Sequence, residues 1–216
     1  MAYETWVRPI ITTTGGIFNL GAHSLKILLT TKLQVRLLLE QLERIGIESL
    51  GLVLVSGIAT GSVMALQFGY GMAKFGATLY VPKVVALTVA REMGPVFTSL
   101  LVAGRIGSGI AAEVSSMKVS QQIDAMTALG TSPIERIVIP RILAAVIALP
   151  ILTLLADYLS LLGAMFVAES ELGIPSGFYW VKTIDTLRLV DLSTGMMKTA
   201  VFAVFIALAS CWRGLN

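Results

Sequence analysis

The sequence predicts an all-α fold: a polytopic transmembrane helical bundle with an N-terminal interfacial amphipathic helix and one short cytoplasmic helix between spans. The 216 residues are 56% hydrophobic and only 13% charged, whereas soluble domains average about 45–50% apolar and about 25% charged residues. The mean hydropathy is +0.84. Four apolar segments are long enough to cross a hydrocarbon layer of about 30 Å.

These segments divide the chain into an N-terminal arm, 1–44, and a transmembrane domain, 45–216. The predicted spans cover residues 45–70, 82–112, 137–168 and 196–212. Basic residues near span ends mark the cytoplasmic side of a membrane protein. Here they are Lys26, Lys32, Arg36, Arg44, Lys118, Arg136, Arg141 and Arg213. Acidic residues dominate 169–191, so the sequence predicts this segment outside and the N-terminus in the cytoplasm.

Residues 16–44 have the pattern of an amphipathic helix. Apolar residues alternate with polar ones up to Leu29, and charges then recur at fourfold spacing, at Lys32, Arg36, Glu40 and Arg44. A helix lying in the cytoplasmic headgroup region accounts for such a charged face. A solvated helix with one packed face is the alternative.

The second predicted span carries ionisable residues inside an apolar segment, which is costly in a bilayer and usually marks a functional interior. At about 100° per residue, one stripe of this helix holds four polar side chains. They are Arg91, Thr98, Arg105 and Glu113, with Glu92 on the flank.

Two further features shape the same span. Gly104, Ser108 and Ala112 form a neighbouring face of small residues, which predicts close packing against another helix. Pro95 removes the backbone hydrogen bond to the carbonyl of Arg91, so a bend is expected beside the charged residues.

The charges have two interpretations. In the structural one they pair with one another, and with Asp157 of the third span, to hold the bundle together. In the functional one some of them line a cavity that receives a charged head group. We favour the functional interpretation for Arg91 and Glu92, and structural pairing for Arg105 and Glu113 near the cytoplasmic end. Asp157 is the candidate partner of Arg91.

The first span repeats small residues at every fourth position, at Gly57, Gly61, Ala65 and Gly69. This spacing lets helix backbones approach closely, either within one chain or between two copies. Gln67 adds a buried polar group that needs a partner.

The loop after the second span predicts a short helix over 119–130. Ser115 or Ser116 can cap its start, while Gly130 and Pro133 suit its end. Its apolar face holds Val119, Ile123, Met126 and Leu129, with Asp124 elsewhere. Such a short helix is not stable alone in water. It must pack against its own spans or dock into a groove on a cytosolic partner.

The sequence lacks the residue sets of an enzyme. It has one histidine, His23, and one cysteine, Cys211, and it shows no metal-ligand spacing, phosphate-binding loop or serine elbow. A basic face for nucleic acid is also missing, despite the net charge of +3. We therefore expect no enzymatic activity, no metal and no cofactor in this chain, and an energy source outside it.

Two long runs resemble the central signature of the MlaE/YrbE permease family. They are AREMGPVFTSLLVAGRIGSGIAAE at 90–113 and MKVSQQIDAMTALGTSP at 117–133. Pro140–Arg141, LPILTLLAD at 149–157 and the closing CWRG also fit. The resemblance covers approximately residues 15–216.

This resemblance implies the permease subunit of an ABC-type transporter that moves phospholipids between the inner and outer membranes of a bacterium. The implied partners are cytosolic ATPase subunits carrying ATP and Mg, an MCE-domain protein on the periplasmic side, and a second copy of the chain. The implied location is the inner membrane. Residues 119–130 would be the ATPase coupling helix. The candidate lipid-cavity residues are Arg91, Glu92, Thr98, Gly57, Gly61 and Gln67.

Members of that family usually continue past this Arg-Gly pair into a fifth span, whereas this sequence stops at Asn216. We interpret the difference as a truncation, and a subunit working with four spans is the alternative. Two other functions stay open: an ion-driven secondary transporter with Glu92 and Asp157 as proton carriers, and a scaffold that only anchors partners.

Overall fold

The computed structural model describes residues 2–30 and 34–216, and every regular element in these ranges is helical. The α-helices are α1 (Ala2–Thr30), α2 (Val35–Leu42), α3 (Glu48–Ala73), α4 (Val81–Thr88), α5 (Gly94–Val102), α6 (Ser108–Val119), α7 (Gln122–Ala128), α8 (Ile139–Leu172), α9 (Ser176–Thr186) and α10 (Leu189–Leu215). The π-helical turns are η1 (Glu43–Ile47), η3 (Val89–Met93), η4 (Ala103–Gly107) and η5 (Ile134–Val138), and η2 (Thr78–Tyr80) is a 3₁₀ turn.

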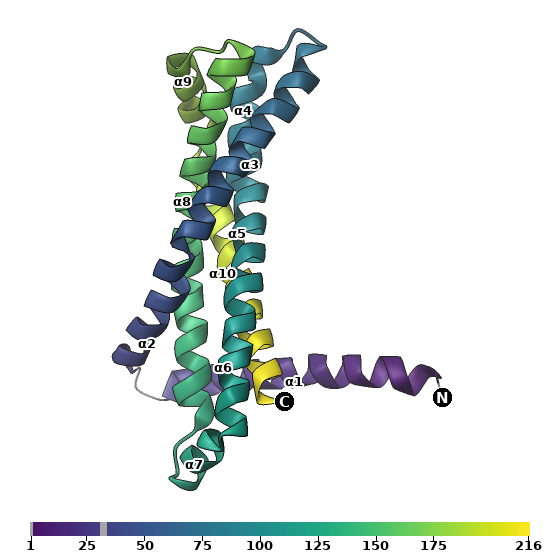
Figure 1. Ribbon diagram of the computed structural model, residues 1–216, viewed down its shortest axis with the longest axis vertical. Helices are drawn as coiled ribbons and strands as arrows, with labels where there is room; N and C mark the ends of the chain where they lie inside the picture. Colours follow the sequence, from purple (N-terminus) through teal and green to yellow (C-terminus); the bar gives the residue numbers. More distant parts are fainter. Residues whose placement is uncertain (1, 31–33) are drawn as a thin grey trace.

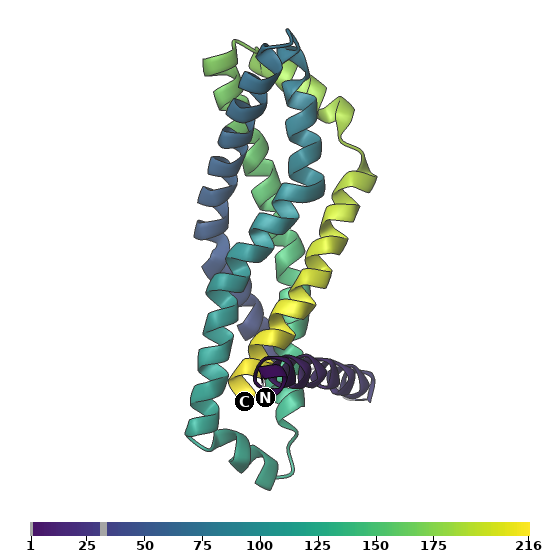
Figure 2. The same ribbon diagram turned by 90° about the vertical axis from the view of Figure 1, so that its right-hand side faces the viewer.

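These elements join end to end into four rods with the length and composition of membrane spans: Val35–Ala73, Thr78–Val119, Ile134–Leu172 and Leu189–Leu215. The rods lie side by side along the long axis of the molecule (Figure 1). Helix α1 lies across one end of this bundle, α7 projects beyond the same end, and α9 covers the opposite end (Figures 1 and 2). The predicted all-α polytopic bundle is confirmed.

Each predicted span lies within one rod, and each rod extends beyond it at both ends. A transmembrane helix needs only about 20 residues, whereas the rods have 39, 42, 39 and 27 residues. The hydropathy of the side chains identifies only the apolar part of a helix, whereas the backbone hydrogen bonds continue the helix past its last apolar residue. The predicted ends are therefore too short.

The N-terminal arm is not the single amphipathic helix predicted over 16–44. Helix α1 ends at Thr30, and α2 continues through η1 into α3, so Arg36, Glu40 and Arg44 lie on the first rod. The stretch 35–45 contains neither proline nor glycine, so nothing in it interrupts the helix. Lys32, the first charge of the predicted series, lies outside the described residues.

The small residues of the first span pack against α8 of the same chain. A Cβ atom on Gly61 would lie 1.8 Å from the backbone oxygen of Ser160, and one on Gly57 would lie 2.9 Å from that of Ala156. The Ser160 hydroxyl donates a hydrogen bond of 2.8 Å to the carbonyl of Gly57. Close packing is as predicted, and this face is occupied within one chain and not by a second copy.

The second rod does not follow the straight helix from which its stripe was derived. Turns η3 and η4 use the wider i→i+5 hydrogen bonding of a π-helix, which rotates everything after them. Gly104, Ser108 and Ala112 still share one face, but that face is exposed, so the predicted close packing is not made within the described residues of this chain. Gly107 faces α10 instead, where its Cβ would lie 3.0 Å from Ser210 Oγ. Pro95 is the second residue after η3, so the helix is irregular where the sequence predicts a bend.

Helix α8 forms the centre of the bundle and contributes to apolar clusters at three levels along its length. The middle cluster includes Val53, Val102, Leu149, Leu152 and Ala203. The cluster near α9 includes Val81, Val85, Ala164 and Tyr179. The cluster near α1 and α7, here called the inner cluster, includes Leu20, Val114, Ile137, Val138 and Cys211. These contacts hold the rods that carry the candidate sites.

Candidate functional site

Arg91 of η3 forms an ion pair with Asp191 in the first turn of α10. Its Nη2 and Nε atoms lie 2.5 Å and 2.7 Å from Oδ1 of Asp191. The backbone N–H of Arg188 donates to Oδ2 of the same carboxylate at 3.0 Å, which caps the start of α10. Asp191 is only 3% exposed. Because both oxygens have partners, its burial is compensated.

Lys198 joins the same two segments further along α10. Its Nζ atom lies 2.7 Å from Oε1 of Glu92 and donates a 2.9 Å hydrogen bond to the carbonyl of Arg91. Between the two ion pairs lies Gly195, whose Cβ would stand 2.5 Å from the oxygen of Ala90, so only glycine allows this close approach. We call the four residues of these two ion pairs, Arg91, Glu92, Asp191 and Lys198, the charged cluster.

The prediction that Asp157 pairs with Arg91 is wrong. Asp157 is 5% exposed in α8 and makes no ion pair with any residue that the structure describes. Its expected part in structural ion pairs is wrong for the same reason. The partners of Arg91 and Glu92 are Asp191 and Lys198. From the sequence, this part of the chain is assigned only to the outer loop and the fourth span. The available signal was a lysine inside an apolar span, which is costly unless it is paired.

An apolar groove follows the charged cluster along the line where α5 meets α10. It has a volume of about 270 Å³ and is here called the seam groove. Its lining includes Val96, Ser99, Leu100, Ala103, Phe202 and Phe205. On both helices these residues lie nearer to α7 than the charged cluster does. A charged group and an apolar groove thus follow one another on a single surface, which is the order of polar and apolar parts in a lipid.

The remaining candidates for a lipid cavity are placed elsewhere. Gly57 and Gly61 are buried against α8, and Thr98 is 2% exposed in the small space between α3, α5 and α8. Gln67 is exposed on α3 and not buried as predicted. Of the six residues, only Arg91 and Glu92 belong to a charged cluster. The register change at η3 explains why Thr98 leaves their stripe.

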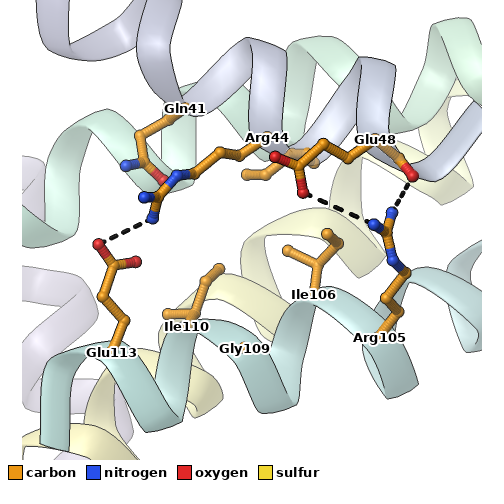
Figure 3. Close-up of a pocket in the computed structure, with 9 residues that line it drawn as sticks. Gln41, Arg44, Glu48, Arg105, Ile106, Gly109, Ile110 and Glu113 are labelled. Atoms are coloured by element: carbon orange, nitrogen blue, oxygen red, sulfur yellow. Dashed lines mark hydrogen bonds and ion pairs between the residues drawn. The ribbon is translucent and has the colours of Figure 1, made fainter. Parts of the chain in front are cut away.

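A polar crevice of about 420 Å³ opens between the first rod and α6 (Figure 3). Arg44 pairs across it with Glu113 at 2.9 Å, and Glu48 pairs with Arg105 at 3.6 Å. Each rod therefore supplies one arginine and one glutamate. Ile110 lies between the two pairs (Figure 3).

Glu113 extends this network to a third rod. Its Oε2 atom lies 2.9 Å from Nη2 of Arg141, which is 3% exposed in α8. Arg141 also donates a 3.0 Å hydrogen bond to the carbonyl of Ile137. The structural pairing expected for Arg105 and Glu113 is present, with Arg44, Glu48 and Arg141 as the partners.

The helix predicted over 119–130 is divided in two. Val119 is the last residue of α6, and α7 begins at Gln122 after Gln121 adopts a φ of 57°. The serines proposed as caps, Ser115 and Ser116, lie inside α6, because that helix continues beyond the predicted start of the loop.

The predicted end of this helix is confirmed. Gly130 has a φ of 73°. Its N–H donates to Thr127, and the N–H of Thr131 donates to Met126, at 3.0 Å and 2.9 Å. This is the usual closing pattern around a left-handed glycine.

The apolar face of the same segment is also divided. Ile123 and Met126 are partly buried against the inner cluster. Val119 and Leu129 are 86% and 83% exposed, and Asp124 is exposed as well. Packing on the chain's own spans therefore accounts for half of the face and leaves the other half free.

Within the described residues, no group of three His, Cys, Asp or Glu side chains lies close enough together to hold a metal ion. The arrangement offers paired charges, an apolar groove and an exposed short helix. These features suit the binding of an amphipathic molecule and of a protein partner.

Comparisons with known proteins agree with this chemistry. The family model described as Permease MlaE matches residues 38–216. A probable ABC transporter permease protein of Rickettsia typhi is 38% identical over 200 residues, which make up 92% of this chain and 77% of that protein. The intermembrane phospholipid transport system permease protein MlaE of Haemophilus influenzae is 33% identical over 181 residues, 83% of this chain and 69% of that protein.

For a plant relative, the match covers a smaller share of the relative's own length. The chloroplastic protein TRIGALACTOSYLDIACYLGLYCEROL 1 of Arabidopsis thaliana is 35% identical over 189 residues, 88% of this chain and 54% of that protein. The resemblance expected from the two long sequence runs is confirmed. The chain belongs to the MlaE family of ABC transporter permeases.

Proposed function

We propose that this chain is the permease subunit of a transporter that moves phospholipids between the inner and outer membranes of a bacterium. A separate cytosolic ATPase binds and hydrolyses ATP with Mg, and this chain has no enzymatic activity of its own. A second copy of the chain completes the permease, and an MCE-domain protein receives or delivers lipid on the outer side. The name of the Haemophilus influenzae relative supports phospholipid as the substrate.

The observation that carries the proposal is the charged cluster above the seam groove. Arg91 is half-exposed, with 52% of its side chain accessible, although it is paired with Asp191. Its guanidinium is therefore available to a phosphate, which such groups bind with charge-assisted hydrogen bonds. The seam groove beside it takes apolar chains. A phospholipid fits this order, because its phosphate and its acyl chains then meet surfaces of matching chemistry.

We propose α7 as the coupling helix. Ile123 and Met126 hold it on the bundle, while Val119 and Leu129 present exposed apolar side chains for a groove of the ATPase. Of the expected coupling residues Val119, Ile123, Asp124, Met126 and Leu129, we therefore assign the contact with the ATPase to the exposed ones, Val119, Asp124 and Leu129. ATP-driven movement of the ATPase would pass through α7 into α6, with which it is in contact.

We place the protein in the inner membrane, with the N-terminus and α7 on the cytoplasmic side. Lys118 lies in the last turn of α6, Arg136 in η5 and Arg213 in the last turn of α10. Each of these three elements contacts α1 or α7. An excess of basic residues at span ends marks the cytoplasmic side.

The test is ATP-dependent transfer of a fluorescent phospholipid by the complete complex in vesicles. Arg91→Ala should lower the transfer rate by about 10- to 150-fold, since losing a charge-assisted hydrogen bond costs about 1.5–3 kcal/mol. Because Arg91→Ala also leaves the buried carboxylate of Asp191 without its cation, assembly with the ATPase is measured on the same samples, and it should be retained. Arg36→Ala is the matched control, because Arg36 is 92% exposed and paired only with a neighbour on its own helix.

Each other outcome contradicts the proposal in a recognisable way. Transfer that needs no ATPase and stops when the proton gradient collapses would favour an ion-driven carrier. Wild-type transfer by Arg91→Ala and by Lys198→Ala would remove the charged cluster from the mechanism. An assembled complex that moves no lipid under any condition would favour a scaffold.

A further inference from the structure

A second apolar groove lies where α1 crosses α8 and α10, away from the seam groove. Its volume is about 240 Å³. Its walls come from all three helices and include Ser24, Leu28, Ile142, Leu143, Val146 and Val204. We call it the interfacial groove. An engineered apolar cavity of about 150 Å³ already binds benzene, so this space is large enough for a hydrocarbon ligand.

The position of α1 sets the depth of this groove in the membrane. Gly16 of α1 lies against the Trp212 ring, and Gly21 lies next to Leu208. Tryptophan is enriched where a bilayer meets water, and a helix lying across a bundle end fits the boundary between head groups and acyl chains. Both features place α1 at one membrane surface.

From α1 the groove runs along α8 toward the membrane interior. Its lining on α8 extends from Ile139 to Val146. These seven steps of an α-helix correspond to about 10 Å, which is about two-thirds of one leaflet of a hydrocarbon layer about 30 Å thick. The groove therefore follows the direction and depth of an acyl chain in that leaflet.

Ser24 adds a polar requirement to the apolar walls. It is 5% exposed, and its Oγ atom has no hydrogen-bond partner among the described residues. A buried hydroxyl without a partner is unfavourable, and Ser24 lines the groove. The ester carbonyls of a glycerophospholipid lie at the boundary of head groups and acyl chains, where α1 lies. Such a carbonyl can accept the missing hydrogen bond.

We propose that the interfacial groove binds a glycerophospholipid of the leaflet that contains α1. One acyl chain fills the space between α1, α8 and α10, and an ester carbonyl accepts a hydrogen bond from Ser24. This lipid is separate from the transported one, because the charged cluster lies elsewhere on α10. It ties α1 to the bundle.

The test uses the complete complex in vesicles of phosphatidylethanolamine and phosphatidylglycerol that contain a phosphatidylethanolamine with a diazirine in one acyl chain. After irradiation, mass spectrometry locates the labelled peptides. We expect stronger labelling at 21–28 and 139–146 than around Val55 and Val63, which are exposed apolar residues of α3. Equal labelling of these regions would overturn the proposal.

Variants test the site itself. Val146→Trp should fill the groove and abolish its labelling, whereas Ile147→Trp, at a neighbouring exposed position, should not. Ser24→Ala should lower labelling at limiting probe by about fivefold, the effect of one hydrogen bond of about 1 kcal/mol. His23→Ala, at an exposed neighbour, is its control.

Unchanged labelling in both Val146→Trp and Ser24→Ala would overturn the proposed site. An unlabelled groove together with a labelled α3 would also overturn it, because a protein segment would then cover the groove. Lipid transfer is measured on the same samples. Transfer with an unlabelled groove contradicts only this inference, and a labelled groove without transfer contradicts only the proposed function.

Discussion

A Cβ atom on Gly94 would lie 1.6 Å from Oδ1 of Asp157, so α5 and α8 meet at this point only because residue 94 has no side chain. That Oδ1 atom has no hydrogen-bond partner among the described residues. The contact lies directly after η3, which carries Arg91 and Glu92. The position of the charged cluster thus depends on a glycine that neither belongs to the cluster nor bears a charge.

Gly94→Ala should destabilise the protein by about 1–3 kcal/mol, the usual cost of overpacking. Asp157→Ala should remove most of this penalty, because the atoms nearest to the new methyl group belong to the carboxylate. Thermal unfolding in detergent of both single variants and the double variant measures the coupling. Additive effects would show that the two residues do not meet.

Gly61→Ala should destabilise the protein more than Gly71→Ala. The new Cβ at position 61 would stand 1.8 Å from the backbone oxygen of Ser160, whereas one at position 71 would have no neighbour within 4 Å. A backbone atom cannot move aside as a flexible side chain can, so α3 and α8 must separate. The difference in unfolding temperature measures this effect, and equal temperatures would exclude the packing described.

Glu113→Gln should destabilise the protein more than Glu48→Gln. Glu113 balances the charge of Arg141, which is 3% exposed, and removing one partner of a fully buried pair costs about 3–5 kcal/mol. Because Glu113 is itself 33% exposed, we expect a smaller loss. Glu48 is 55% exposed, and surface pairs contribute about 0–1 kcal/mol. Chemical unfolding in detergent compares them, and the reverse order would refute the assignment.

Gly130→Val should disturb the end of α7 without unfolding the bundle. Its φ of 73° costs a residue with a side chain about 1–2 kcal/mol. Gly177→Val is the control, because that glycine has no positive φ and no neighbour within 4 Å of its Cβ. Hydrogen exchange of 122–131 should accelerate only in the first variant. Unchanged exchange would mean that the glycine does not set this turn.

Leu129→Asp should weaken only ATPase binding, whereas Ile123→Asp should also loosen the packing of α7. Leu129 is 83% exposed, so its variant should unfold like the wild type but co-purify less ATPase. Ile123 packs against the inner cluster, so its variant should also expose 122–128 to faster hydrogen exchange, since a buried charge without a partner is costly. If Leu129→Asp retained full ATPase binding, the exposed half of α7 would not be the docking surface.

Local patterns predicted the helices well and their contacts poorly. The turn at Gly130 was found because a left-handed glycine with a following proline is a local signal. The stripe through Arg91 and Thr98 failed, because the π-helical turn η3 rotates the rod between them and no residue pattern indicates such a turn. The small residues at Gly104, Ser108 and Ala112 do share one face, but that face is exposed within the described residues, because the sequence does not say which rods become neighbours.

The sequence by itself determined that this protein is a bundle of membrane-spanning helices of the MlaE family, with a charged segment in its second span. Apolar length, spacing and the family signature are all local properties of the chain. Only the tertiary structure decided the partners: Asp191 for Arg91, 100 residues away, and α8 for the glycines of α3. Such pairs depend on the rotation of each rod about its axis and on which rods become neighbours, and close packing determines both.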